Sequence, residues 1–203
     1  PAIKGGTFSS RNSTIHTDNL FVNPSPTSSR VSATWFTSMD IQGQVSINDN
    51  SEESTTGLAA MSLNRPSYKT HTKNSKAWGI GTLKNKKIIF ELQNSNLDAA
   101  DNDTYNNNIL VVDGKTTFLP SVLMTHSFGI NKDWIIQDTE NMVDLTFTPG
   151  SLNSRILNVI AMRTNYTTIY GVYNGVLMDQ DGNKIVLKNF PGIIHRNILR
   201  ITL

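Results

Sequence analysis

The chain of 203 residues carries 18 Lys and Arg against 16 Asp and Glu, a formal net charge of +2, and it contains no cysteine. This balance excludes the strongly basic surface that attracts nucleic acid or an anionic membrane, and the lack of cysteine excludes disulfides and thiol chemistry. No stretch is apolar over the length of a membrane span, and no signal peptide is visible. The composition does not indicate a particular cellular compartment.

Residues 1–30 predict an irregular polar arm. Pro24 and Pro26 stand among many Ser, Thr and Asn, and Leu20–Val22 is the one short apolar patch. Such an arm is either a loosely packed terminus or a segment that docks on a neighbouring domain or subunit. The expected organisation is therefore this arm followed by one all-β domain, residues 31–203.

Alternating apolar residues predict short strands from Val31 onward, with Val31, Ala33 and Trp35 on one face. Further strands are expected at residues 41–47, 57–63, 77–83 and 87–92, with a polar loop at 48–56 and a hairpin turn at 84–86.

The second half repeats this pattern after a polar insertion at residues 94–108. Expected strands lie at residues 108–112, 116–119, 122–128, 134–136 and 143–147, and Asp113-Gly114 forms a turn between the first two.

The clearest architecture lies between Leu152 and Phe190. A strand pattern covers residues 157–163 and continues from Tyr166 to Met178, and Asp181-Gly182 predicts a type I′ turn before the return at residues 184–188. The last strand or strands are expected in residues 193–203. No amphipathic helix is found, so the sequence predicts an all-β fold, an antiparallel barrel or sandwich.

Several short motifs, taken in order, resemble one family. They are Leu63-Asn64-Arg65-Pro66, Trp78-Gly79-Ile80-Gly81, residues 108–115, Trp134-Ile135-Ile136, residues 143–149, Tyr170-Gly171-Val172-Tyr173-Asn174-Gly175, and finally Gly192, His195 and Arg200. Over roughly residues 31–203 the chain resembles a large uncharacterised bacterial family related to hydroxyneurosporene synthase and the lipocalin-like (calycin) proteins.

The resemblance implies two linked antiparallel β-barrels or half-barrels. The chain departs from the family pattern where Ile194 and Ile201 replace a Glu and a terminal Trp, and it is shorter than the two-barrel members. A jelly-roll sandwich, as in capsid or adhesive proteins, is the rival architecture, because it shares the Asn- and Thr-rich composition and the polar arm.

Two residues are candidates for catalysis. His126 shares its expected strand face with Met124 and Phe128, which predicts an inward position. It is either a hydrogen-bonded interior histidine or a general acid/base in an apolar cavity. Asp144 either faces solvent or pairs with Arg163 or His126.

Trp78, Trp134 and Tyr170 are candidate ligand-binding residues that would line an apolar cavity, although barrel core explains them as well. No pair of His residues has the spacing of a metal site, and the calcium-like start at Asp179 lacks its closing Glu, because Phe190 stands there. No nucleotide-binding motif occurs, so we expect neither a metal nor another cofactor.

Two functions remain open. The first is a calycin-like barrel that binds an apolar small molecule, and the family resemblance also allows a cofactor-independent hydratase or isomerase in which His126 or Asp144 handles the proton. The alternative is a structural β-sandwich subunit that associates with its neighbours through the N-terminal arm. The sequence does not decide whether the protein is an enzyme.

Overall fold

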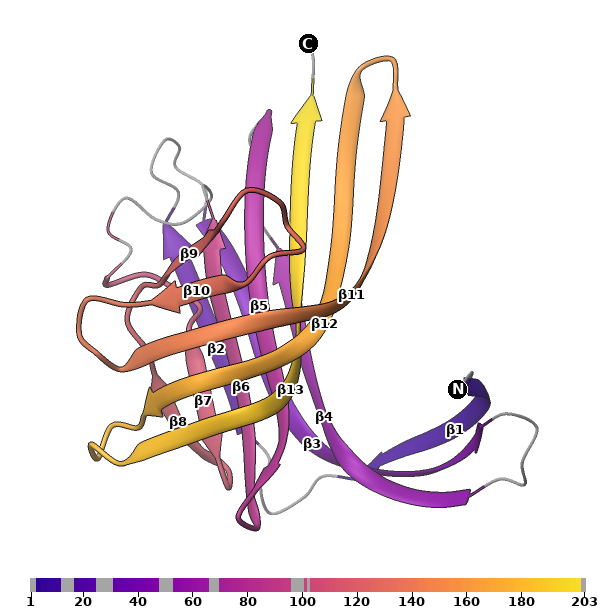
Figure 1. The fold of residues 1–203 in the computed structure, drawn as a ribbon, viewed down its shortest axis with the longest axis vertical. Coiled ribbons are helices and arrows are strands. Elements are labelled where there is room, and N and C mark those ends of the chain that lie inside the picture. The colour runs from indigo at the N-terminus through magenta and orange to yellow at the C-terminus, as the bar shows by residue number, and fades with distance from the viewer. Residues whose placement is uncertain are drawn as a thin grey trace.

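The protein forms two antiparallel β-sheets (Figure 1). The computed structural model describes residues 3–11, 17–24, 31–47, 53–65, 70–95, 101 and 103–201. The strands of this part are, in chain order, β1 (Ile3–Arg11), β2 (Thr17–Pro24), β3 (Val31–Ile47), β4 (Glu53–Arg65), β5 (His71–Leu83), β6 (Lys86–Ser95), β7 (Ile109–Val112), β8 (Lys115–Phe118), β9 (Leu123–His126), β10 (Trp134–Gln137), β11 (Val143–Val159), β12 (Met162–Met178) and β13 (Lys184–Ile201).

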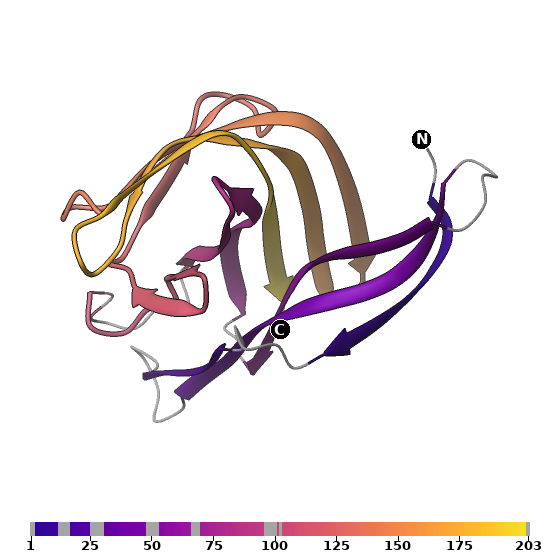
Figure 2. The same ribbon diagram turned by 90° about the horizontal axis from the view of Figure 1, so that it is seen from below.

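The larger sheet has nine strands in the order β8-β7-β6-β5-β13-β12-β11-β10-β9. It curls strongly into an open half-barrel, so that its two ends approach each other around one core (Figure 2). The pairing of β13 with β5 joins the end of the chain to its middle. The predicted all-β, antiparallel architecture is confirmed, and the curled sheet is consistent with a calycin-like barrel.

The core fills the inside of this curl, which we call the inner face of the larger sheet. Along β10, Trp134 and Ile136 are buried while Ile135 and Gln137 are exposed, which is the alternation of a strand with one wet face. The ring of Tyr173 lies at the centre, with ring centroids 5.0 Å from Phe90 and 4.7 Å from Phe147. These three aromatic side chains are fully buried, so the inner face is a packed core.

The smaller sheet is built around β3. β2 pairs with its first half and β1 with its second half, while β4 pairs along its other edge. This sheet packs on the outer face of the larger one, where Phe36 meets Trp78 with ring centroids 5.9 Å apart. The buried residues of this second core are Phe21, Phe36, Ile89, Ile109 and Val111.

The N-terminal segment differs from the irregular arm that the composition predicts. Its described residues form β1 and β2, and both pair with β3 of the same chain. The long edge of β3 offers hydrogen-bonding groups that must find partners, and this tertiary demand overrides the weak strand propensity of a Ser- and Gly-rich segment. The division into an arm of residues 1–30 and a domain of residues 31–203 stays a prediction.

Two of the predicted hairpin turns are confirmed. Asp113 and Gly114 have φ values of 48° and 81°, and Lys84 and Asn85 have values of 49° and 65°, as two-residue turns between twisted strands require. The hairpin at Asp181 is present, but the predicted type I′ turn there is wrong.

The turn at Asp181 is longer than a type I′ turn. Only Gly182 has a positive φ, of 79°. The Asp179 carboxylate accepts hydrogen bonds from the backbone N–H groups of Asp181, at 3.0 Å, and Asn183, at 2.9 Å. An aspartate side chain therefore closes this turn.

The strand predicted over residues 157–163 is also wrong. β11 ends at Val159 and β12 begins at Met162, so Ile160 and Ala161 form the tip of a hairpin. Neither of these two residues is a Gly, Asn, Asp or Pro, so the sequence pattern continues through the turn and predicts a single strand.

The same hairpin runs beyond the curl. From Ser151 to Val159, β11 pairs with β12 only, among the described residues. Ile160 at the tip is fully exposed. Across the neighbouring strands, Arg163, Arg200 and His71 stand in one row.

Candidate functional site

The two predicted catalytic residues lie on opposite faces of the larger sheet. His126 pairs with Trp134 at the edge of the inner face, with ring centroids 4.3 Å apart, and its Nδ1 lies 2.8 Å from the carbonyl oxygen of Ser127. Asp144 is exposed, and its Oδ1 accepts a hydrogen bond of 2.9 Å from Nε2 of Gln137. The structure does not bring the two residues together.

The neighbours of His126 explain its partial burial. Met124 is buried on the same strand, but Phe128 lies beyond the end of β9 and is fully exposed. The strand face inferred from the spacing of Met124, His126 and Phe128 therefore stops at His126.

The predicted ligand-binding residues also lie on two different faces of the larger sheet. Trp134 is 1% exposed in the main core, and its Nε1 donates a hydrogen bond of 3.1 Å to the carbonyl oxygen of Ile130. Trp78 and Tyr170 instead share the outer face, because each stands opposite Ile193 on a neighbouring strand. Two strand spacings place them about 10 Å apart. The structure thus brings Trp78 and Tyr170 together and leaves Trp134 elsewhere.

A buried ion pair lies beside Trp78. Nζ of Lys76 is 2.5 Å from Oε1 of Glu91, and their side chains are only 12% and 1% exposed. The same Nζ donates a hydrogen bond of 3.3 Å to Oγ of Ser62 on β4, and it lies 5.8 Å from the centroid of the Trp78 ring. The smaller sheet therefore covers the pair and helps to hold the ammonium group.

Burial governs the charge of Glu91. Desolvation raises the pKa of its carboxyl above the ordinary value of 4.5, while the charge of Lys76 and hydrogen bonds from Lys76 and Ser62 oppose the rise. Oε2 of Glu91 is buried and has no hydrogen-bond partner among the described residues. A buried carboxylate oxygen without a donor is costly, so Oε2 leaves Lys76 and Ser62 as the described groups that offset the burial of Glu91.

His195 is the next residue along this outer face, directly opposite Lys76 on one side and Thr168 on the other. Its Nδ1 lies 3.0 Å from the hydroxyl of Tyr166 and 3.1 Å from that of Thr168. The Tyr166 ring stacks on the imidazole at a centroid distance of 5.5 Å. Two hydroxyl groups and one ring thus fix the orientation of His195.

The pKa of His195 is lowered from its ordinary value of 6.5, first by burial and then by the positive charge of Lys76. A lowered pKa keeps the imidazole neutral at neutral pH. Its Nδ1 is occupied by the two hydroxyl groups, while Nε2 makes no hydrogen bond with the described residues. Nε2 is therefore the atom that can exchange a proton with a ligand.

We call this group the outer-face site. Its residues come from five strands of the two sheets and are Ser62, Lys76, Trp78, Glu91, Tyr166, Thr168, Tyr170 and His195. Within this group Glu91 is buried and Tyr170 is half exposed.

Comparison with protein families places the chain in a known group. The family model described as "Domain of unknown function (DUF2804)" matches residues 32–200. The chain belongs to this family. No curated protein and no solved structure matches it. The matched region covers the larger sheet together with β3 and β4 of the smaller one, leaves out β1 and β2, and includes every residue of the outer-face site.

Two further properties bear on the chemistry of the DUF2804 domain. In the part that the structure describes, no group of three His, Asp or Glu side chains is placed to hold a metal ion. The same part contains no helix that is long and apolar enough to cross a lipid bilayer. The outer-face site offers what its own side chains supply: a neutral imidazole, a buried carboxyl group, an ammonium group and aromatic walls.

Proposed function

We propose that this DUF2804 domain binds an apolar small molecule that carries one neutral polar group, and that the outer-face site receives it. Trp78, Tyr166 and Tyr170 supply aromatic surface for the apolar part. The observation that carries the proposal is the oriented imidazole of His195, with Nε2 open, beside the buried Lys76–Glu91 pair. A hydroxyl or carbonyl group would bond to Nε2 without bringing an uncompensated charge into the site.

The same arrangement supports acid–base chemistry without a cofactor, as in a hydratase or an isomerase. In the tautomer with its proton on Nδ1, the neutral imidazole accepts a proton at Nε2, and the hydroxyl oxygens that accept from Nδ1–H stabilise the cation that forms. This role would fall to His195. The catalytic roles predicted for His126 and Asp144, and the relation to hydroxyneurosporene synthase, stay predictions.

Binding is tested with three probes that share an eight-carbon chain: 1-octanol, 2-octanone and octanoate. The protein has three Trp residues. A variant with Trp35→Phe and Trp134→Phe leaves Trp78 as the sole reporter. We expect 1-octanol and 2-octanone to bind and to change the fluorescence of Trp78. His195→Gln should weaken the binding of both probes about tenfold, which corresponds to the loss of one buried hydrogen bond. Equal binding by the His195→Gln variant would refute the placement of the polar group.

Proton transfer is tested separately in heavy water. Exchange of hydrogen for deuterium beside the carbonyl of 2-octanone, followed by NMR, reports directly on a protein base. We expect exchange with the unmodified protein and its loss with His195→Gln, while His126→Gln leaves it unchanged. Exchange that instead depends on His126 would return the catalytic role to that residue.

The alternative, a subunit of an assembly, has one observation in its favour. The projecting β11–β12 hairpin exposes Ile156, Leu157 and Ile160, and exposed apolar groups of this kind often mark contact surfaces. The N-terminal segment is less suited to this role, since β1 and β2 are engaged with β3 of their own chain. Light scattering decides: a large oligomer that dissociates on Ile160→Asp supports assembly, and a monomer refutes it.

A further inference from the structure

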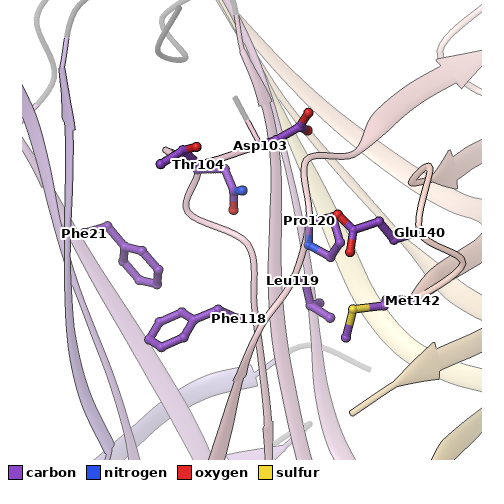
Figure 3. A pocket seen from close by; sticks show the side chains of 9 residues that line it. Phe21, Asp103, Thr104, Phe118, Leu119, Pro120, Glu140 and Met142 are labelled. Atoms are coloured by element: carbon purple, nitrogen blue, oxygen red, sulfur yellow. The ribbon is translucent and has the colours of Figure 1, made fainter. Parts of the chain in front are cut away.

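A separate pocket of about 320 Å³ lies where Phe21 of β2 meets the loops around residues 103–106, 118–120 and 140–142 (Figure 3). Phe21 of β2 lines one wall, the segment from Asp103 to Asn106 a second, and the segment from Phe118 to Pro120 the floor, while Glu140 and Met142 close it. Both sheets contribute to it, and it shares no residue with the outer-face site. Its volume suits one small molecule, at the low end of the usual range of ligand pockets.

One end of the pocket is aromatic. The rings of Phe21 and Phe118 meet edge to face with centroids 5.7 Å apart. Phe118 is 63% exposed, so much of this side chain is accessible to a ligand. Exposed aromatic surface inside a pocket favours an apolar or cationic group over water, because the face of the ring is electron-rich.

The opposite end is acidic. Figure 3 shows the carboxyl groups of Asp103 and Glu140 on the side away from the two phenylalanine rings. Oδ1 of Asp103 accepts a hydrogen bond of 2.6 Å from Oγ of Ser121, which orients it. No Lys, Arg or His is among the residues that line the pocket. The two carboxylates are thus uncompensated within it.

A third carboxylate stands on the same loop as Glu140. The Asp138 carboxylate accepts hydrogen bonds from the backbone N–H groups of Met142, at 3.1 Å, and Val143, at 3.2 Å. The negative potential therefore comes from two separate loops that the fold brings to one place, and a cation seated between them would gain from both.

We propose that this pocket binds a small organic cation, an amine or quaternary ammonium compound with one apolar group. The cationic head would lie between Asp103 and Glu140, and the apolar group would lie against Phe21 and Phe118. Such a ligand matches the two ends of the pocket at once, whereas an anion would be repelled and a neutral ligand would leave the two negative charges without a counter-ion in the pocket. This second site is independent of the proposed function.

The test uses three probes of similar size: benzyltrimethylammonium, benzyl alcohol and benzoate. Titration calorimetry or NMR shifts of the full chain should show binding of benzyltrimethylammonium that weakens as salt rises, and much weaker binding of the other two. Stronger binding of benzyl alcohol or benzoate would overturn the proposal.

Variants locate the ligand. Glu140→Gln, at an exposed turn, should weaken binding of benzyltrimethylammonium about two- to fivefold, which is the loss of one solvent-exposed charge contact. Phe118→Ala should weaken it similarly. Asp144→Asn removes an exposed carboxylate outside the pocket and serves as the matched control. An equal loss with Asp144→Asn, or none with Glu140→Gln, would show that the cation binds only through the general charge of the surface.

Discussion

The buried Lys76–Glu91 pair gives the sharpest prediction. Lys76→Met keeps the length of the side chain and removes its charge, so Glu91, 1% exposed, would face burial without its counter-ion. Breaking a buried pair in this way costs about 3 to 5 kcal/mol in the free energy of unfolding at neutral pH. A typical domain has about 5 to 15 kcal/mol in total, so the variant should fold but unfold at clearly lower urea concentration.

The stability loss of Lys76→Met should depend on pH, because it depends on the ionisation of Glu91. The folded-state pKa of Glu91 is raised above 4.5, so ionisation of Glu91 favours the unfolded chain, and its adverse effect grows as pH rises from 4.5 through the folded-state pKa. Without Lys76 that pKa rises further. The stability deficit of Lys76→Met relative to the unmodified protein should therefore be largest at neutral pH and shrink below pH 4.5.

Urea unfolding at several pH values, followed by Trp fluorescence, measures both effects. The control is the double variant Lys76→Met with Glu91→Gln, in which no charge is buried; it should recover most of the lost stability and lose the extra pH dependence. A deficit below about 1 kcal/mol, the size expected for a solvent-exposed pair, would refute the reasoning. So would a deficit in Lys76→Met that does not change with pH.

Three further predictions concern single side chains. By NMR, the pKa of His195 should lie below 6.5, and Lys76→Met should raise it because a neighbouring positive charge is removed. A histidine with a depressed folded-state pKa contributes stability above pH 6.5 that is lost as pH falls through the folded-state pKa. His195→Gln should therefore flatten the fall in unfolding free energy below pH 6.5. Tyr173→Phe should cost about 1 kcal/mol in urea unfolding, because the fully buried hydroxyl donates a hydrogen bond of 2.8 Å to the carbonyl oxygen of Ile193. Gly192→Ala should lower the free energy of unfolding by about 1 to 3 kcal/mol or more, because the new methyl group would collide with the Tyr173 ring and the carbonyl oxygen of Trp78. Gly150→Ala is the control and should cost clearly less, because its methyl group would lie 3.6 Å from the nearest atom, the carbonyl oxygen of Tyr170.

The sequence predicted the fold class because its signals are local. Alternation along β10 and β5, and the Asp113-Gly114 turn, follow from steric rules that act over a few residues. The boundary of the β11–β12 hairpin was missed, since Ile160 and Ala161 carry no turn signal. The pairing of β1 and β2 with β3 was missed because it depends on a partner strand and not on propensity.

The candidate site depended on pairings between distant strands. Trp78 and Tyr170 could be named as candidates, but only the order β5-β13-β12 sets them on either side of Ile193. One signal for the missed residues was present: Glu91 interrupts the apolar run from Ile88 to Leu92. A charged residue within a buried strand needs a partner, and this rule points to a buried cation without saying which one.

The free edge of β11 has a consequence for how the protein behaves in concentrated solution. From Ser151 to Val159 its backbone can accept one more strand, including the same strand of a second molecule in antiparallel register. Opposing this, Arg155, Arg163 and Arg200 give that end of the sheet a positive charge with no carboxylate on the same stretches. Salt screens this repulsion over a length of about 10 Å at 0.1 M. Association of two molecules through β11 should therefore depend on ionic strength. The molecules should stay apart in dilute buffer and associate as salt is added.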